Sequence, residues 1–227
     1  VRHCGIATRN QRLAAFKSFF HYVAAVEPEQ LLNCQRILGL RMKKTSRGPM
    51  NFFSPEGLHL LLSQPDTTTQ RGRRDHALLV LLYDSAARVQ EIVDLRVRDL
   101  RLELPATVSL HGKGRKSRVV PVTTKTASVM ERYFGENGWI GHSGALDLPI
   151  FTNSRKCELS RAGVAHILAR HLKSIPPPEN RHVPATASPH CLRHSKAINL
   201  LRSGVPLIYI RDFLGHASVT STEIYAR

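Results

Sequence analysis

The sequence has few cysteines and no long apolar run. The cysteines form no C-x-x-C pair and are widely spaced, at Cys4, Cys34, Cys157 and Cys191. This spacing argues against a zinc ribbon or a disulfide scaffold and is typical of a reducing cytosol. The longest apolar run, residues 77–83, is far too short to span a bilayer, and no secretory signal is visible. His190, Cys191 and His194 lie close together, but no further soft ligand follows at a standard spacing, so we predict no metal site.

Acidic residues are also scarce. The chain has 17 Asp and Glu against 33 Lys and Arg, which gives a formal net charge of +16 and a sequence pI near 10.5. Cations spread through a folded chain indicate a polyanionic partner, most often nucleic acid. A ribosomal-type or merely basic protein has the same charge, so charge alone leaves that alternative open.

The remaining composition is that of a globular protein. Hydrophobic residues make up 42% of the 227 residues, which suits one large domain, or one domain and part of another. Because the chain starts at a valine and stops abruptly after Arg227, we expect it to be part of a longer protein.

Helical periodicity dominates the N-terminal part. Residues 9–25 have apolar side chains at helical spacing, at Leu13, Phe16, Phe20 and Val23. The stretch 41–55 is basic, contains glycine and proline and follows neither period, which is typical of a linker. We therefore predict a partial N-terminal helical domain over 1–45, a linker over 46–53 and a second, larger domain over 54–227.

Capping signals divide the larger domain. Ser54 followed by Pro55 starts a helix, and a long helical pattern continues through residues 75–87. Alternating or β-branched residues over 107–111 and 118–122 predict a β-hairpin with a glycine-rich basic tip. Further helices are expected at 90–95, from the Ser160 cap to Lys173, at 190–203, at 206–214 and at about 219–226. The predicted fold class is mainly α with a small antiparallel β-sheet (α+β).

Two stretches early in this domain carry candidate functional residues. In AARVQEIVDL, Arg88 follows a nearly uncharged helix and Glu91 comes three residues later, which a purely structural ion pair also explains. In HGKGRKSRVV, four cations come with no acid, and Gly112 and Gly114 let the tip approach a phosphate backbone closely. A solvated turn is the alternative for the second stretch.

Two later stretches add imidazoles and a phenol. In SPHCLRHSKAINLLRSG, His190 and Arg193 are three residues apart and share a helix face. We expect His194 to point elsewhere, as a core or capping histidine. In LGHASVTSTEIYAR, His216 follows a glycine cap and Tyr225 lies on the next helix, where a tyrosine is most often a packed aromatic.

Together these groups suit phosphoryl transfer without a metal. No Ser-His-Asp or Cys-His order, no paired carboxylates and no Walker-type loop are present. Arginines and histidines can hold the non-bridging oxygens of a phosphodiester, a lysine can protonate the leaving oxygen, and a tyrosine can attack phosphorus. A free phenol has a pKa of about 10. We expect a site dense in positive charge to favour its phenolate.

The order of these motifs resembles the tyrosine recombinases, also called the phage-integrase family of site-specific DNA recombinases. The motifs are A-A-R-V-x-E-I-x-x-L, G-K-G-x-K-x-R-x-V-P, H-x-L-R-H-S and L-G-H-A-S-V-x-x-T-x-x-Y, and the resemblance covers nearly the whole chain. Each motif alone is weak evidence, whereas four in this order are strongly specific. The catalytic set of the family falls on Arg88, Lys113, His190, Arg193, His216 and Tyr225.

The resemblance implies a role for each of these residues. Arg88 and Arg193 would clamp the scissile phosphate, with Glu91 supporting Arg88. His190 would act as an acid or base, and His216 would hydrogen-bond a phosphate oxygen.

The reaction implied by the resemblance is a transesterification. Tyr225 would be the nucleophile and Lys113 would protonate the leaving 5′-oxygen, with Lys116 as the alternative acid. The products would be a 3′-phosphotyrosyl link and a free 5′-hydroxyl, formed without metal, cofactor or ATP.

The implied partner is a double-stranded DNA recombination site, bound by a homotetramer, with a monomer possible in the absence of DNA. Contacts to the DNA are expected from Lys43, Lys44, Arg47, Arg115, Lys116 and Arg118. The family normally has a fuller N-terminal domain, and many members continue past the tyrosine, so we expect full affinity and stable tetramers to need a longer chain. We expect a bacterial protein of the cytoplasm, associated with the nucleoid.

Several functions share this chemistry. The interpretation we favour is a recombinase that integrates or transposes a mobile element, and a housekeeping resolver of chromosome dimers is close to it. A type IB topoisomerase or telomere resolvase remains an alternative. A non-catalytic DNA-binding regulator on the same fold is another, although it predicts loss of at least one catalytic residue, and all six are present.

Overall fold

The computed structural model describes residues 4–44, 50–112, 117–184, 186–216, 218, 222 and 225. The chain divides into two compact units, Val1–Pro49 and Met50–Arg227. Within the described residues, no helix is both long and apolar enough to cross a membrane.

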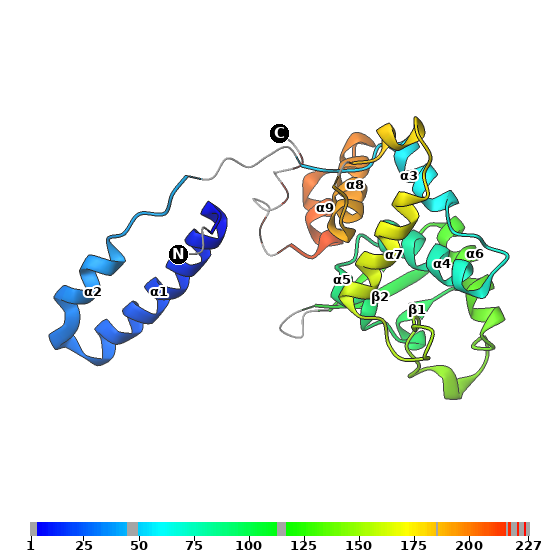
Figure 1. Cartoon of the computed structure of the whole chain (residues 1–227). Coiled ribbons are helices and arrows are strands. Elements are labelled where there is room, and N and C mark those ends of the chain that lie inside the picture. The colour runs from blue at the N-terminus through cyan, green and yellow to red at the C-terminus, as the bar shows by residue number, and fades with distance from the viewer. Residues whose placement is uncertain are drawn as a thin grey trace. The chain divides into compact units, whose positions relative to one another are not determined.

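The first unit is a pair of helices. Helix α1 (Ile6–Val26) is followed by a 3₁₀ turn (Pro28–Gln30) and by α2 (Leu31–Leu38), which packs against α1 (Figure 1). The helix predicted over residues 9–25 is therefore confirmed. Its apolar positions are only partly covered, because Leu13 is buried while Phe16 is 57% exposed.

The segment after α2 returns to α1. The Asn10 side chain donates to the Lys43 carbonyl at 2.8 Å and accepts from the Lys43 amide at 3.1 Å. Lys43 and Lys44 are themselves exposed.

The second unit is mainly helical with one small sheet, as predicted. Its helices are α3 (Pro55–Ser63), α4 (Gln70–Asp84), α5 (Val89–Val93), α6 (Thr124–Glu136), α7 (Arg161–Lys173), α8 (Pro189–Arg202) and α9 (Leu207–Leu214). The antiparallel sheet has the order β1 (Leu100–Arg101), β2 (Thr107–His111) and β3 (Ser117–Pro121). Short 3₁₀ helices cover Val97–Asp99, Ser143–Ala145 and Glu179–His182.

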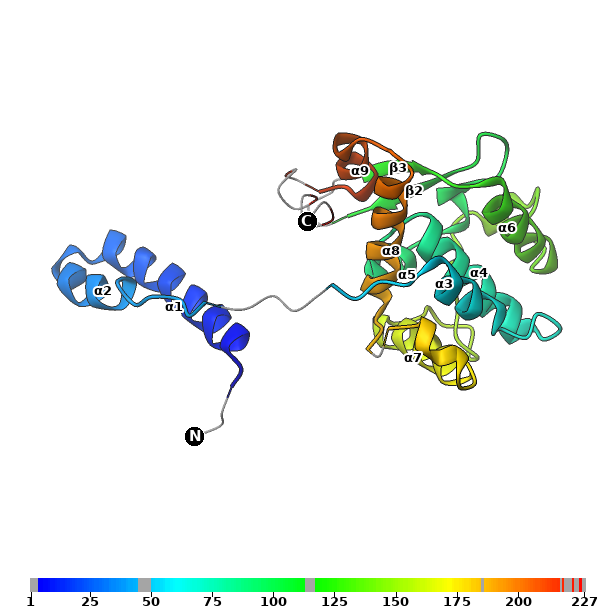
Figure 2. The ribbon, with the colours of Figure 1, turned by 90° about the horizontal axis from the view of Figure 1, so that it is seen from above.

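Helix α4 is the centre of this unit. It packs against α3, α6 and α8, and Leu78, Leu79, Leu81 and Leu82 are fully buried. This continuous apolar run explains why the chain places α4 inside the unit, with helices on several sides of it (Figure 2). The sheet joins the same core through β2 and β3, where Val108 faces Val120 across the ladder and both are buried.

Capping residues mark the helix starts. Ser54 and Ser160 each accept a hydrogen bond from a backbone amide three residues later, both at 3.0 Å, which confirms two predicted N-caps. The helical pattern after Ser54 forms two helices, because a turn over residues 64–69 separates α3 from α4. Helix α6 was not predicted, and the helix predicted over about 219–226 lies largely outside the described residues.

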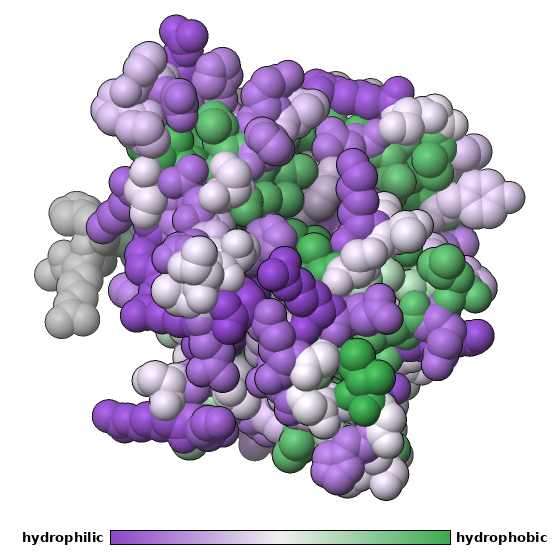
Figure 3. Space-filling view, turned by 90° about the vertical axis from the view of Figure 1, so that its right-hand side faces the viewer, coloured by the Kyte–Doolittle hydropathy of each residue, from purple (hydrophilic) through white to green (hydrophobic). Residues whose placement is uncertain are grey.

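One outer face of the molecule is shown in Figure 3. Apolar side chains form small groups among hydrophilic ones there. No broad apolar patch lies on this face.

The start of α4 depends on the absence of a side chain at Gly72. A Cβ atom there would lie 1.8 Å from the Asp66 carbonyl oxygen, in the turn that Thr69 caps by accepting from the Gly72 amide. Replacing glycine by alanine inside a helix gains about 0.5–1 kcal/mol, whereas overpacking costs about 1–3 kcal/mol. For Gly72→Ala the cost of overpacking is therefore larger than the gain from replacing glycine in a helix.

We predict that Gly72→Ala lowers the free energy of unfolding by about 1–2 kcal/mol, measured by urea denaturation. Gly135→Ala in α6 is the control, because a Cβ there meets only the Ile140 Cδ1 atom at 3.7 Å. The control variant is expected to be unchanged or slightly more stable. Equal or higher stability of Gly72→Ala would contradict the steric account.

Candidate active site

A buried carboxylate, Glu91, joins two arginines from distant parts of the chain. Glu91 is at the third position of α5 and is 3% exposed. Its Oε1 accepts from Arg88 Nη1 at 2.9 Å and from Arg118 Nη1 at 2.8 Å. Its Oε2 accepts from the Arg88 amide at 2.7 Å and from Arg118 Nη2 at 2.9 Å. Burial alone raises the pKa of Glu91, but these hydrogen bonds outweigh it and hold the pKa below its usual value.

Arg118, predicted as a DNA contact of the hairpin, has a side chain that is 14% exposed and bound to Glu91. Its Nε donates to the Phe213 carbonyl at 3.0 Å, which links β3 to α9. The structure therefore gives Arg118 a bridging position between elements. The other predicted tip residues, Lys113, Arg115 and Lys116, lie outside the described residues, as does Arg47 in the N-terminal unit.

Arg193 is the most deeply buried cation of the site. It lies on α8 and is 1% exposed, so its hydrogen bonds must come from the protein. Its Nη1 donates to the Ala86 carbonyl and its Nη2 to the Leu214 carbonyl, both at 2.6 Å. These carbonyls lie just beyond α4 and at the end of α9, where helix dipoles favour a cation. Burial, aided by Arg88 and Arg118, lowers the pKa of Arg193 to about 10, so it stays charged at neutral pH.

The turn before Arg88 has an unusual backbone. Ala86 has a φ of 46°, in the left-handed region, which costs an L-residue about 1–2 kcal/mol. This conformation ends α4 and presents the carbonyl that Arg193 binds. Arg88, two residues later, keeps 42% of its side chain exposed and donates from Nη2 to the Gly215 carbonyl at 3.3 Å.

His194 contacts the tyrosine near the end of the chain. Its Nδ1 lies 2.8 Å from the Tyr225 hydroxyl, and Tyr225 is 8% exposed. The prediction that His194 points away from the site is therefore wrong. His190, one turn earlier on α8, packs edge-on against His194 with ring centroids 5.0 Å apart. The spacing of four residues between the two histidines was the available signal, because such residues share a helix face.

Burial decides the protonation of this pair. It raises the pKa of Tyr225, against the opposing charge of Arg193. The expectation that a cationic site would favour the phenolate is not met in this structure. Burial, together with His190 and Arg193, lowers the pKa of His194 to about 4, so both side chains are neutral at pH 7. The pKa of His190 is lowered as well, by partial desolvation of the ring although the residue stays exposed, and then by Arg193 and Arg88.

His216 follows the left-handed turn that ends α9. Gly215 has a φ of 64°, and an added Cβ there would lie 2.9 Å from the Arg118 Cδ atom. The turn lets the His216 amide donate to the Arg211 carbonyl at 3.0 Å, while its Nδ1 lies 3.0 Å from the Thr222 hydroxyl. Burial and the nearby arginines lower the pKa of His216 to about 4.

The structure therefore brings together five of the six predicted catalytic residues. Arg88, Arg193 and His216 meet around the turn at 214–216, and Tyr225 joins them through His194. Helices α8 and α9, which carry or flank this cluster, lie side by side in both ribbon views (Figures 1 and 2). The sixth residue, Lys113, belongs to the part of the hairpin that is not described.

Comparison with known proteins identifies the family. Residues 51–227 match the model of the phage integrase family. The chain is 36% identical over 224 residues to y4rC of Sinorhizobium fredii, named as an integrase/recombinase, covering 97% of this chain and 65% of that protein. It is 32% identical over 218 residues to the tyrosine recombinase XerC of Oceanobacillus iheyensis, covering 95% of this chain and 68% of XerC. The chain thus spans about two thirds of the length of these relatives.

A solved structure confirms the fold. The site-specific recombinase XerH, bound to its difH substrate before cleavage, matches with a TM-score of 0.65 and 24% identity over 81% of this chain and 52% of that one. Both the family model and the sequence relatives cover most of the chain, and the predicted resemblance is confirmed. The chain belongs to the phage integrase family of tyrosine recombinases.

Proposed function

We propose that this protein cleaves and rejoins DNA strands at a specific site through a covalent bond between Tyr225 and a 3′-phosphate. The observation that carries the proposal is the Tyr225 hydroxyl, which lies 2.8 Å from His194 Nδ1 among buried and half-buried arginines. Two sequence relatives named as integrases or recombinases support DNA as the substrate.

The reaction would be a transesterification that balances without an oxidant or a cofactor. The Tyr225 oxygen attacks phosphorus and gives its proton to a base, for which His190 is our candidate, while the bond from phosphorus to the 5′-oxygen breaks. Lys113 gives that oxygen a proton, with Lys116 as the alternative donor. Because the new phosphodiester keeps the energy of the old one, attack by another 5′-hydroxyl can rejoin strands without ATP.

The arginines supply the charge that the transition state needs. The cluster contains three guanidinium groups and one carboxylate: Arg88 and Arg118 bind Glu91, while Arg193 binds backbone carbonyls, which leaves an excess of two positive charges. Such an excess attracts a phosphodiester and stabilises its extra charge at the pentacoordinate stage. Arg88 is the half-exposed member and is placed to reach an incoming phosphate.

The histidines would have different tasks. His216, neutral at pH 7, can donate a hydrogen bond to a phosphate oxygen through its Nε2. His190 is exposed at the start of α8 and can exchange a proton with the reacting groups.

We assign His194 the positioning of the Tyr225 hydroxyl. The pKa of His194 is about 4, and that of Tyr225 is raised above the usual phenol value. Moving the proton from phenol to imidazole before DNA binds is therefore strongly unfavourable. In the resting site the histidine holds a neutral hydroxyl in place. A bound phosphodiester adds a negative charge that raises the pKa of both His194 and Tyr225, so the hydroxyl stays protonated until it attacks phosphorus.

The wider setting is also proposed from the family. The N-terminal unit, with Lys43, Lys44 and Arg47, would close around double-stranded DNA, and Arg115 and Lys116 would contact the backbone from the hairpin. Strand exchange needs four cleavages, which suits a homotetramer on DNA. Movement of a mobile element is the setting we favour, and the name of y4rC agrees with it.

We predict that the protein forms a covalent adduct with a nicked suicide duplex carrying its site in the presence of EDTA, detected as a shifted band on a denaturing gel. Tyr225→Phe removes only the phenolic oxygen and should bind DNA but form no adduct. Tyr209→Phe, on an exposed tyrosine, is the matched control and should react normally. An adduct in Tyr225→Phe, or a strict need for a divalent metal in cleavage, would contradict the mechanism.

A second prediction separates positioning by His194 from packing. His194→Phe fills the space but cannot accept a hydrogen bond, so single-turnover cleavage should slow about tenfold to a hundredfold, with DNA affinity unchanged. In His194→Asn the amide oxygen takes the approximate place of Nδ1 and should restore most of the rate. Equal rates for the two variants would assign His194 a packing function only. Urea denaturation of both variants checks that stability does not explain the difference.

A further inference from the structure

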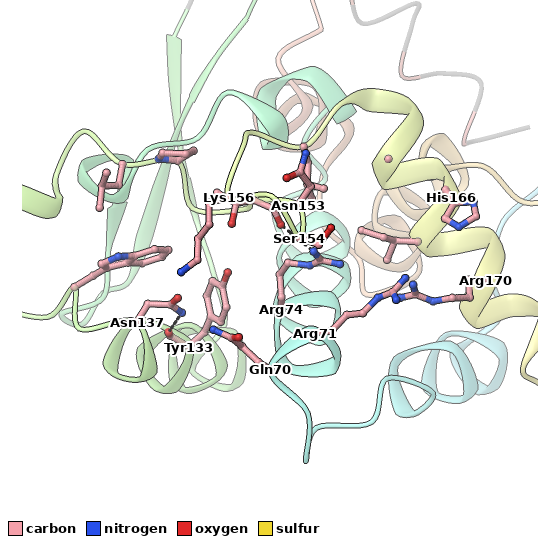
Figure 4. A pocket seen from close by; sticks show the side chains of 17 residues that line it. Gln70, Arg71, Arg74, Tyr133, Asn137, Asn153, Ser154, Lys156, His166 and Arg170 are labelled. Atoms are coloured by element: carbon pink, nitrogen blue, oxygen red, sulfur yellow. Dashed lines mark hydrogen bonds between the residues drawn. The ribbon is translucent and has the colours of Figure 1, made fainter.

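A second polar hollow lies away from the catalytic cluster. It has a volume of about 730 Å³ and lies between the start of α4, the end of α6, the loop before α7 and α7 itself (Figure 4). None of the catalytic residues described above lines it. The proposed function therefore leaves this hollow unexplained.

The charges around the hollow have one sign. Four cations line it, Arg71, Arg74, Lys156 and Arg170, and no Asp or Glu is among the described lining residues. Figure 4 shows Arg71 and Arg170 reaching toward each other from α4 and α7. Two guanidinium groups that approach in this way repel each other unless an anion lies between them.

The buried carboxylate of Asp75 holds two of these arginines, Arg74 and Arg170, in place. Asp75 is fully buried, and its Oδ1 accepts from Arg74 Nε at 3.0 Å and from Nη2 at 2.6 Å. Its Oδ2 accepts from Arg170 Nη2 and lies 3.0 Å from His171 Nε2. The single negative charge of Asp75 thus holds two guanidinium groups, so one positive charge remains in excess at a fixed position. Such preorganisation lowers the entropic cost of binding an anion.

One donor in this group has no partner. Arg170 Nη1 is buried and makes no hydrogen bond, the one such side-chain nitrogen or oxygen found in the described part of the chain. An unsatisfied buried donor costs about 1–3 kcal/mol, and donors of this kind are expected to find a partner. A small shift of the side chain would turn this donor toward a ligand oxygen in the hollow.

Lys156 enters the hollow from a strained turn. Its φ is 62°, a left-handed conformation in which glycine or asparagine is favoured over lysine. The Asn153 side chain holds this turn by accepting from the Arg155 and Cys157 amides at 2.9 and 3.1 Å. In Figure 4 the Lys156 side chain runs into the hollow toward Asn137. Strain kept at a cationic side chain is typical of a binding site.

We propose that this hollow is a binding site for a phosphate group, separate from the phosphate that reacts with tyrosine. Arginine forks and a lysine at fixed positions are the groups that hold phosphate oxygens. The phosphate can belong to the backbone of the DNA or to a free nucleotide, whose base would pack on Trp139 at the rim. The proposal does not depend on the tyrosine chemistry, because binding can be measured without cleavage.

The chain itself provides the probe. Trp139 is its single tryptophan and lines the hollow, so fluorescence excited at the indole band reports on this place alone. The experiment titrates the protein with pyrophosphate, with ADP and with a short DNA duplex. It is repeated with the double variant Arg71→Gln/Lys156→Gln, whose cations have no ion pair among the described residues. The control is Arg155→Gln, which removes an exposed cation from the same loop outside the hollow.

We expect a saturable change in Trp139 fluorescence, kept in Arg155→Gln and weakened about tenfold for each cation lost, or about a hundredfold in the double variant. Saturation by pyrophosphate or ADP would assign the site to a free phosphate compound. Saturation by the duplex alone, lost in the double variant, would assign it to the DNA backbone. No saturable change with any ligand, or an equal change in the double variant, would overturn the proposal. Cleavage by Tyr225 can succeed or fail independently of each result.

Discussion

The hydrogen bonds of the Glu91 carboxylate hold the second unit together at the candidate active site. They join Arg88 at the start of α5 to Arg118 on β3, and Arg118 in turn reaches the end of α9. A buried charge is costly unless it is paired, so each of these groups needs the others. Since the turn after α9 carries His216, and Arg193 binds the carbonyl just before it, the geometry of the whole cluster depends on this carboxylate.

Burial is the second constraint on the site, because it disfavours the charged forms of the tyrosine and histidine side chains. The arginines favour negative groups, yet burial raises the pKa of Tyr225 and lowers the pKa of His194 and His216 to about 4. Among the described residues, the site without DNA is therefore cationic at its arginines, with a neutral tyrosine held by a neutral histidine. Entry of a phosphodiester supplies a negative charge that pairs with the arginines. Binding of DNA would thus bring phosphorus to a neutral hydroxyl, which loses its proton as it attacks.

Local signals predicted the elements better than the contacts between them. The serine caps at Ser54 and Ser160, the hairpin and the helix that carries His190 and Arg193 follow from spacing and capping alone. Glu91 was correctly expected beside Arg88, because the two are three residues apart. Its bond to Arg118 joins residues 27 positions apart, and the contact of His194 with Tyr225 joins residues 31 apart, so neither has a local signal. The basic hollow combines α4, α6 and α7 and was likewise not predictable from motifs.

The most direct test of this account is the effect of Glu91→Gln on single-turnover cleavage and on stability. The substitution keeps the shape and removes the charge, so we expect cleavage to slow at least about tenfold and the free energy of unfolding to fall by about 3 kcal/mol. Glu131→Gln, an acid exposed on α6, is the control and should change neither quantity. A Glu91→Gln protein that cleaves DNA at the rate of the unmodified chain would contradict the claim that this carboxylate assembles the active site.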